Sequence, residues 1–271
     1  MKDRIVIKLG GSSLQNSETL QQLATLIKGY QKRRYRVVVV HGGGPAINAE
    51  LTKHNICWQF INGQRQTTPE MMNVIDDVLA KKVNGSLVEK LTQEKIAAVG
   101  ISAAEEKILF CLQASKELMQ VGKVQSVDVS AIENLLAQFG AKVPVVAPIG
   151  IGANGEKYNV NADWAAAQIA MTLNAKKLIF LTDQSGILDG DKQLVAIATP
   201  QMIDRMIEDG VISGGMFTKV SAMTTALNAG IKHVRVLHAN KACMLLSAER
   251  IGTLLTANVH LNKGLMHGRA S

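Results

Sequence analysis

The chain has 271 residues, of which 47% are hydrophobic and 19% charged, and its formal net charge is +8. These values exclude a disordered chain and allow one large α/β domain or two lobes that share a sheet. Aromatic residues make up only 4% and no long Lys/Arg block occurs, which argues against nucleic acid. We therefore interpret the charge as favouring an anionic metabolite, with much of the excess simply solvated.

We expect a cytoplasmic protein with no membrane partner. A strand predicted from Arg4 onwards leaves no room for a signal peptide, and no uncharged apolar run approaches the ~18 residues of a membrane span. The cysteines Cys57, Cys111 and Cys243 are far apart and odd in number. They indicate neither a disulfide framework nor a zinc site.

Unbroken apolar runs rich in β-branched residues predict strands that are buried on both faces, as in a parallel sheet. These runs lie at 4–9, 36–40, 96–99, 108–112, 143–149, 177–181 and 233–237. Segments with helical spacing lie at 18–30, 45–54, 163–173 and 219–229. Their alternation predicts an open α/β sheet with helices on both sides. Residues 105–127 indicate an antiparallel insertion, and Asn154-Gly155 predicts a hairpin turn.

Two predicted strands each end in a run of glycines. Gly10-Gly11 follows the first strand, and Gly42-Gly43-Gly44 follows the second. Consecutive glycines let the backbone approach a ligand closely, because no Cβ intervenes. Where such a turn opens a helix, its free N–H groups and the helix dipole favour an anion. Two such turns, with Lys8 just before the first, suggest an α/β protein that handles phosphate.

Three charged residues are candidates for the chemistry. Lys8 lies in an apolar strand, where an unpaired ammonium is costly, although a lysine at a strand end also snorkels to water. Lys219 is predicted at a helix start, where the dipole disfavours a cation unless an anion is bound; a surface lysine is the alternative. Asp163 either caps the following helix or orients neighbouring lysines, and the sequence leaves both roles open.

Two loops carry further polar candidates. Arg65 lies in a loop that enters a helix, with Thr68 available as cap and Pro69 near the first helical position. Its guanidinium has the geometry to grip a carboxylate, and a solvated loop arginine is the alternative. The segment 181–190 follows a strand end, where open α/β sheets bind ligands. The histidines show no metal-ligand spacing, and the common glycine-rich nucleotide motifs are absent.

In this order the motifs resemble the amino acid kinase family, and within it the acetylglutamate branch. The resemblance covers nearly the whole chain, from about Ile5 to Thr253. Its motifs are Lys8-Leu9-Gly10-Gly11-Ser12, Val40-His41-Gly42-Gly43-Gly44-Pro45, Asn62-Gly63-Gln64-Arg65-Gln66-Thr67, Asn159-Val160-Asn161-Ala162-Asp163, Thr182-Asp183-Gln184-Ser185-Gly186-Ile187-Leu188 and Gly215-Met216-Phe217-Thr218-Lys219-Val220. The first two are family-wide, whereas the third and fourth together are closer to the acetylglutamate branch.

The resemblance implies an open three-layer αβα sandwich with a mainly parallel central sheet. Residues 1–174 would form a lobe for amino-acid binding and dimerisation, and residues 175–271 a lobe for ATP. The implied reaction moves the ATP γ-phosphoryl group, with Mg²⁺, to the side-chain carboxylate of N-acetyl-L-glutamate, giving N-acetyl-L-glutamyl 5-phosphate and ADP in arginine biosynthesis. Because a carboxylate is already ionised at pH 7, the reaction needs alignment and charge neutralisation rather than a general base.

The resemblance also implies roles for single residues. Lys8 and Lys219 would stabilise the transferring phosphoryl group, and Asp163 would hold both ammonium groups. The acetylated amino acid would be bound by Gly43, Gly44, Arg65 and Asn159, and Arg65 would bind its α-carboxylate. Phosphate oxygens would accept N–H bonds from Gly10, Gly11 and Gly44. The nucleotide pocket would be lined by Asp183, Gln184, Ser185, Gly186, Ile187, Leu188, Val211, Ile212 and Ser213. Mg²⁺ would be held by phosphates and water, with no protein ligand.

Some features depart from the family pattern. Where relatives carry a Gly-Leu-Ser-Gly-x-Asp-Gly turn, residues 100–106 read Gly-Ile-Ser-Ala-Ala-Glu-Glu, so we expect a remodelled loop that bears on the choice of acyl amino acid. Residues 250–253 keep only part of a Gly-x-Gly-Thr turn, and the tail after Thr256 has no counterpart. Arginine-inhibited hexameric relatives carry an extra helix before the first strand, so we expect a homodimer without arginine feedback.

Two alternative functions stay open. One is a related kinase for aspartate, uncapped glutamate or an acylated aminoadipate. The other is a non-catalytic paralogue that binds nucleotide or a partner protein. The presence of Lys8, Lys219 and Asp163 favours an enzyme over the paralogue.

Overall fold

A computed structural model describes residues 3–61, 63–138, 140, 142–247 and 250–257; the tail at 258–271 lies outside the described residues. The helices are α1 (Ser17–Lys32), α2 (Gly44–Lys53), α3 (Pro69–Asp76), α4 (Asn84–Gln93), α5 (Ser130–Ala137), α6 (Ala162–Thr172), α7 (Pro200–Glu208) and α8 (Gly214–Asn228). Tighter or wider turns form the 3₁₀ segments η1 (Gly11–Gln15) and η3 (Ala239–Leu246) and the π-helix η2 (Asp77–Val83). None of the described helices combines the length and the apolarity needed to cross a bilayer.

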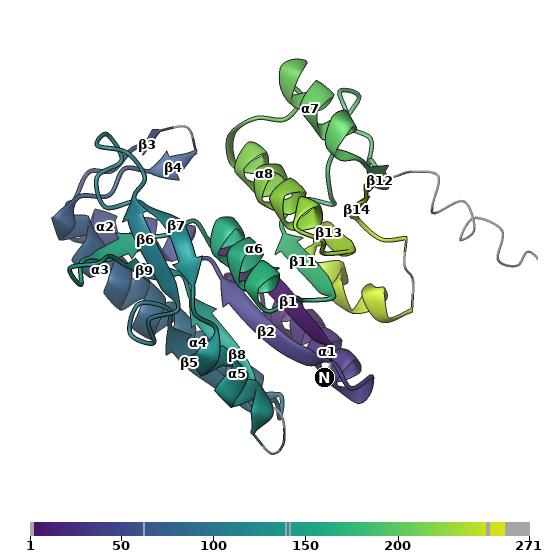
Figure 1. Cartoon of the computed structure of the whole chain (residues 1–271), viewed down its shortest axis with the longest axis horizontal. Helices are drawn as coiled ribbons and strands as arrows, with labels where there is room; N and C mark the ends of the chain where they lie inside the picture. The colour runs from purple at the N-terminus through teal and green to yellow at the C-terminus, as the bar shows by residue number, and fades with distance from the viewer. Residues whose placement is uncertain (1–2, 62, 139, 141, 248–249, 258–271) are drawn as a thin grey trace, which may run out of the picture.

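The strands divide among a central sheet, a smaller sheet and a hairpin (Figure 1). The central sheet has the order β12 (Ile197–Ala198), β14 (Thr253–Leu255), β13 (His233–His238), β11 (Lys177–Thr182), β1 (Arg4–Leu9), β2 (Arg36–His41), β8 (Val143–Ala147) and β5 (Ala98–Ser102). The smaller sheet has the order β10 (Lys157–Asn159), β9 (Ile149–Ile151), β6 (Leu109–Gln113) and β7 (Gly122–Val127), and the hairpin pairs β3 (Phe60–Ile61) with β4 (Gln64–Arg65).

The central sheet is mainly parallel, as the apolar runs predict. From β13 to β5 all neighbouring strands are parallel, and β14 alone among the described strands of this sheet runs antiparallel to its neighbour β13. β1 lies between β2 and β11, so the sheet grows in one direction through β2 and in the other through β11. The centre of the sheet is therefore where the two halves of the chain meet.

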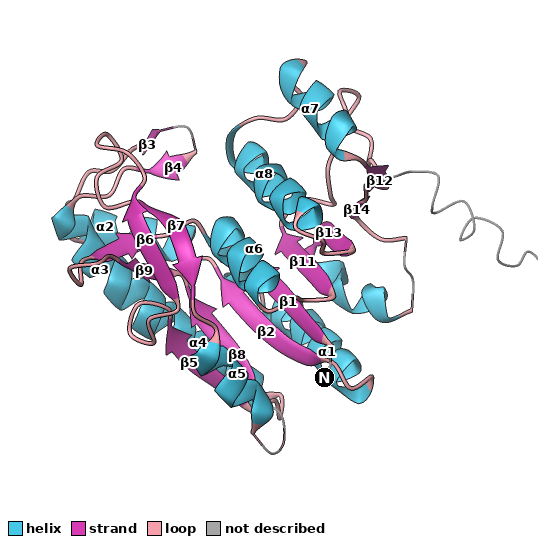
Figure 2. Cartoon of the chain, in the orientation of Figure 1, coloured by secondary structure: helices cyan, strands magenta, loops and turns pink. Residues whose placement is uncertain are grey.

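Helices cover both faces of this sheet, which confirms the three-layer αβα arrangement (Figure 2). Alternate residues of β1 enter different cores: Val6 packs in the core beneath α5, α6 and α8, whereas Ile5 and Ile7 pack in the core beneath α1 and α4. Side chains of a strand alternate between faces, so a strand covered on both sides must be apolar throughout. Lys8 shares the face of Val6 and therefore points toward the layer of α6 and α8.

Several predicted elements need correction. The run 143–149 is not one strand: it divides at Pro148 into β8 and β9, which belong to different sheets. The helix predicted at 219–229 begins earlier, at Gly214, so Lys219 lies in its second turn rather than at its start. The antiparallel insertion is confirmed by the pairing of β6 and β7, and the hairpin turn by Gly155, which has φ +86° between β9 and β10. The predicted lobe boundary near Asn174 falls in the turn between α6 and β11.

His41, at the end of β2, has a structural role. Its Nδ1 lies 2.8 Å from the Gly42 carbonyl and its Nε2 lies 3.1 Å from the Asn84 side-chain nitrogen, which also donates to the Val145 carbonyl. This geometry fits a neutral ring that donates from Nδ1 and accepts at Nε2. Burial lowers the pKa of His41 to about 4, although the bond to the Gly42 carbonyl opposes that effect.

The stability of the chain should therefore decline on acidification from pH 6.5 toward pH 4. Below pH 6.5 the histidine of the unfolded chain binds a proton, whereas the folded one stays neutral until about pH 4. The free energy of unfolding is therefore unaffected by His41 above pH 6.5 and falls by about 3 kcal/mol at low pH. Urea unfolding at several pH values measures this slope, which His41→Gln should flatten. The exposed His54 provides the control, because His54→Gln should keep the wild-type slope. An equally steep slope in His41→Gln would contradict the assignment.

Candidate active site

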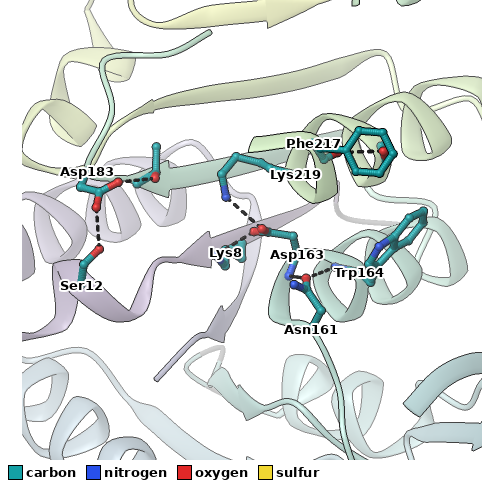
Figure 3. A network of polar contacts seen from close by, with 10 residues as sticks. Lys8, Ser12, Asn161, Asp163, Trp164, Asp183, Phe217 and Lys219 are labelled. Atoms are coloured by element: carbon teal, nitrogen blue, oxygen red, sulfur yellow. Dashed lines mark hydrogen bonds and ion pairs between the residues drawn. The ribbon is translucent and has the colours of Figure 1, made fainter. Parts of the chain in front are cut away.

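Two lysines from distant segments of the chain meet at one carboxylate, and the three residues Lys8, Asp163 and Lys219 form a triad. Lys8 Nζ lies 2.7 Å from Asp163 Oδ1, and Lys219 Nζ lies 2.9 Å from Asp163 Oδ2 (Figure 3). The lysine side chains are 9% exposed and the aspartate side chain 8%. The two lysines come from β1 and α8 and approach the carboxylate from different sides. The sequence-based prediction that these residues converge is thus matched by the geometry.

Each member of this triad is held by its own element. Asn161 caps α6, and its side-chain oxygen accepts from the backbone N–H groups of Asp163 at 2.9 Å and Trp164 at 3.3 Å. The cap is therefore Asn161, which leaves the Asp163 carboxylate free to pair with the lysines. Lys8 is opposite Phe180 in the register of β1 with β11, and Lys219 Nζ lies 5.8 Å from the centre of the Phe180 ring. That ring forms an apolar surface beneath the Lys219 ammonium group.

Burial and neighbouring charge act against each other in this triad. Burial alone would raise the pKa of Asp163, but the two ammonium groups outweigh it and keep that pKa below its usual value. Burial and the nearby Lys8 lower the pKa of Lys219, while Asp163 opposes them. Asp163 is therefore ionised. Two cations and one anion leave a formal charge of +1, which suits an anionic ligand.

Two pockets share the wall formed by Asn161 and Asp163. One, of about 210 Å³, contains Lys8 and is lined by the glycine turns and the β3–β4 hairpin, through residues that include Gly11, Gly43, Gly44, Arg65 and Asn159. The other, of about 490 Å³, contains Lys219 and is lined by Asp183, Gln184, Gly186, Ile187, Leu188, Val211 and Ile212, among others. At this shared wall Asp163 links Lys8 of one pocket to Lys219 of the other.

The two glycine turns touch each other beside Lys8. A Cβ on Gly11 would lie 2.8 Å from both the Gly43 and the Gly44 nitrogen atoms, and real Cβ atoms do not come so close to backbone. A Cβ on Gly43 would overlap the side chain of Leu79, which comes from η2. Packing therefore requires glycine at position 11, where the clash is with backbone, whereas at position 43 the end of the flexible Leu79 side chain can shift.

Three predicted site residues line neither pocket: Gly10, Ser185 and Ser213. The Gly10 N–H donates to the Leu181 carbonyl at 2.8 Å and so ties η1 to β11 rather than pointing at a ligand. Next to it, Ser12 donates its hydroxyl to Asp183 Oδ2 at 3.2 Å, and Thr182 donates to Oδ1 at 3.1 Å (Figure 3). These two bonds orient the Asp183 carboxylate at the edge of the larger pocket.

Arg65 is buried on β4 and enters the pocket that contains Lys8. Burial lowers its pKa to about 10, so it stays charged at neutral pH. Asn159 lines the same pocket, and its amide donates to the Thr67 hydroxyl at 3.0 Å, which in turn donates to the Arg65 carbonyl. The arginine and the asparagine are therefore parts of one hydrogen-bonded wall.

The altered turn at 100–106 is anchored in the apolar cores. Ala103 and Ala104 are buried in apolar cores, and no residue of 100–106 lines either pocket. Ala104 shares an apolar core with Ile47 and Leu79, which line the smaller pocket, so the turn supports the pocket wall without lining it.

Pocket residues that the sequence reasoning missed are mostly apolar. In the smaller pocket they are Ile47, Phe60, Leu79, Val121, Pro148 and Val160, together with Gly42, Gly63, Gln64, Asn161 and Ala162 from the quoted motifs. In the larger pocket they are Thr182, Gly215 and Met216. Thr182 and Gly215 stand in motifs that the sequence made visible, whereas the apolar residues carry no signal that separates a pocket wall from a core.

The profile of the amino acid kinase family matches residues 3–238. The chain belongs to this family. It is 41% identical over 261 residues to an acetylglutamate kinase of Bacillus mycoides (strain KBAB4), covering 96% of this chain and all of that one. A solved protein of Streptococcus mutans UA159 has a TM-score of 0.83 and 29% identity, covering 95% of this chain and all of the other.

A solved N-acetylglutamate synthase of Neisseria gonorrhoeae, in complex with coenzyme A and N-acetyl-glutamate, shares the fold at a TM-score of 0.80 and 21% identity. The match covers 95% of this chain and 60% of the synthase chain. At this identity the likeness concerns the fold alone. Together the comparisons agree with the αβα architecture and with a family of phosphotransferases.

Proposed function

We propose that this member of the amino acid kinase family is an acetylglutamate kinase: it transfers the γ-phosphoryl group of ATP to the side-chain carboxylate of N-acetyl-L-glutamate. The observation that supports the transfer most directly is the triad of Lys8, Asp163 and Lys219 at the wall between two pockets. The similarity to acetylglutamate kinases supports the choice of acceptor. The reaction would supply an acyl phosphate for arginine biosynthesis.

In this proposal ATP occupies the larger pocket and the acceptor the smaller one. The acceptor carboxylate attacks the γ-phosphorus and ADP leaves, so the transferring group passes between the ammonium groups of Lys8 and Lys219. Their positive charge offsets the charge on the equatorial oxygens, and no proton needs to be removed from an ionised carboxylate. The N–H groups of Gly11 and Gly44 would donate to phosphate oxygens. The nucleotide would be contacted by Asp183, Gln184, Ile187 and Leu188.

Mg²⁺ would enter with ATP and be held by phosphate oxygens and water. Both oxygens of Asp163 are already paired with lysines, so that carboxylate is not available to a metal ion. Mg²⁺ often keeps several waters and binds through phosphates, which suits a pocket of this kind. When bound, the ion neutralises charge on the polyphosphate.

A coupled ADP-release assay tests the function. The panel of acceptors is N-acetyl-L-glutamate, aspartate, glutamate and an acylated aminoadipate, and trapping with hydroxylamine identifies an acyl phosphate product. We expect the highest kcat/KM for N-acetyl-L-glutamate. A higher value for another acceptor would make the chain a related kinase, and no turnover with any acceptor would favour a non-catalytic paralogue.

Assembly and location form a second part of the proposal. We retain a cytoplasmic homodimer without arginine feedback. Cys57, Cys111 and Cys243 are all unpaired, as suits a reducing compartment. Sedimentation that gives a hexamer, or inhibition by millimolar arginine, would refute this part.

Arg65→Ala should raise the KM for N-acetyl-L-glutamate about 100-fold with a much smaller change in kcat. The reason is that Arg65 would bind the α-carboxylate equally in the ground state and the transition state, so its loss removes uniform binding. Steady-state kinetics with saturating ATP measures the effect. Arg205→Ala is the control, because Arg205 is exposed on α7 and lines neither pocket. An unchanged acceptor KM in Arg65→Ala would remove Arg65 from the binding site.

A further inference from the structure

Arg65 is a buried cation without a buried anion to balance it. Among the described residues no aspartate or glutamate forms an ion pair with it. Its Nη1 atom is buried and has no hydrogen-bond partner among the residues that the structure describes. A guanidinium that is desolvated and left partly unsatisfied is costly unless a ligand completes it.

Two aromatic rings lie against the guanidinium from one side. Its central carbon lies 4.8 Å from the centre of the Trp58 ring and 4.7 Å from that of the Phe60 ring. The rings meet each other edge to face, with centres 5.8 Å apart and planes at 89°. Phe60 is also the direct partner of Arg65 in the β3–β4 hairpin. Both distances are in the range of cation–π attraction.

An amide holds the guanidinium from one edge. Nη2 of Arg65 donates to Oδ1 of Asn48, which lies on α2. Helix α2 begins at Gly44, in the glycine turn that lines the pocket. The same helix therefore positions both the glycine turn and Asn48, the hydrogen-bond partner of Arg65. With the rings on one side and Nη2 bonded to Asn48, the unpaired Nη1 is the corner of the guanidinium left for a ligand.

From this arrangement we infer that Asn48, Trp58 and Phe60 are positioning residues for the acceptor: they fix Arg65 so that Nη1 meets the α-carboxylate. The inference rests on the proposed function. Phe60 is 52% exposed and lines the same pocket as Arg65, so its ring contacts the guanidinium at the pocket wall. A preorganised guanidinium loses less freedom when the carboxylate binds, which strengthens binding of the acceptor and leaves the phosphoryl transfer itself unaffected.

A double-mutant cycle tests whether Asn48 acts through Arg65. Asn48→Ala should raise the acceptor KM about tenfold and leave kcat and the KM for ATP close to wild type. In an Arg65→Ala background the same change should add nothing further, because the group that it positions is gone. Thr52→Ala is the control: Thr52 is exposed one turn further along α2 and lines neither pocket.

Two further measurements keep the test independent of folding. Phe60→Leu removes a ring that is half exposed, so the fold should persist while the acceptor KM rises about fivefold. With the α-carboxamide analogue of the acceptor, which lacks the carboxylate, Asn48→Ala should have little effect. Thermal unfolding of each variant reports structural damage separately.

The outcomes distinguish this inference from the proposed function. If the wild-type enzyme prefers another acceptor of the panel, the function fails, and the cycle is run with that acceptor. The positioning role is overturned if Asn48→Ala raises KM equally in both backgrounds, or if neither Asn48→Ala nor Phe60→Leu changes it.

Discussion

Lys219→Met should lower kcat about 10³-fold and change the KM of ATP and of the acceptor only slightly. The ammonium of Lys219 matters most when charge builds on the equatorial oxygens of the transferring group, so its loss affects the transition state more than either ground-state complex. Steady-state kinetics, with both substrates varied, separates the two quantities. Lys232→Met, at an exposed lysine just beyond α8, should keep the wild-type rate.

The same substitution should not destabilise the chain. Without Lys219 the triad becomes a neutral pair of Lys8 and Asp163, and the methionine meets the apolar ring of Phe180. Replacing a buried charge by an apolar group of similar volume is often neutral or stabilising when no charge is left unpaired. We therefore expect a melting temperature equal to or above that of the wild type. Near-normal turnover in Lys219→Met would refute the mechanism.

Asp163→Asn should destabilise the chain by about 3 kcal/mol as well as reduce kcat. The change leaves the Lys8 and Lys219 ammonium groups buried, close together and without a counter-ion. Denaturant unfolding measures the loss, and Asp204→Asn, at an exposed position on α7, is the matched control.

Two additional results would identify the cause of that loss. Adding Lys219→Met to Asp163→Asn should recover much of the stability, because it removes one of the two opposed cations. ATP should stabilise Asp163→Asn more than it stabilises the wild type, since phosphate supplies the missing negative charge. If the double variant is no more stable than Asp163→Asn, charge repulsion is not the cause.

The sequence predicted that distant motifs would lie together, and the structure places them side by side. A lysine in an apolar strand is costly without an anion, and consecutive glycines after a strand allow a close approach. Lys8, Gly11 and Gly43 fulfil both expectations. The parallel sheet followed for a similar reason: strands buried on both faces are apolar throughout, and β1 alternates between two cores.

Other features depended on contacts that local sequence does not encode. Asp163 and Asn161 are both good caps, and the structure gives that role to Asn161. The start of α8 at Gly214 moved Lys219 into the second helical turn, because glycines are poor helix formers and mask the boundary. Leu79 reaches the glycine turn through the π-helix η2, whose wider turn leaves no mark in the hydrophobic pattern.

Asn48 and Trp58 show the limit of such reasoning most clearly. They lie 17 and 7 positions before Arg65, and nothing in the spacing connects them to it. Only the hairpin and the direction of α2 bring the amide and the ring to the guanidinium. The charged residues of the site could be recognised in the sequence, whereas the residues that position the charged side chains could not.

The position of Phe180 has a consequence for how charge acts in this enzyme. A benzene ring beneath the Lys219 ammonium keeps solvent from one side of that cation, and an apolar medium screens electric fields far less than water does. The other side of the ammonium group faces the larger pocket, so its charge is felt most strongly there. Phe180, which lines neither pocket, thus strengthens the attraction of Lys219 for an anion in that pocket.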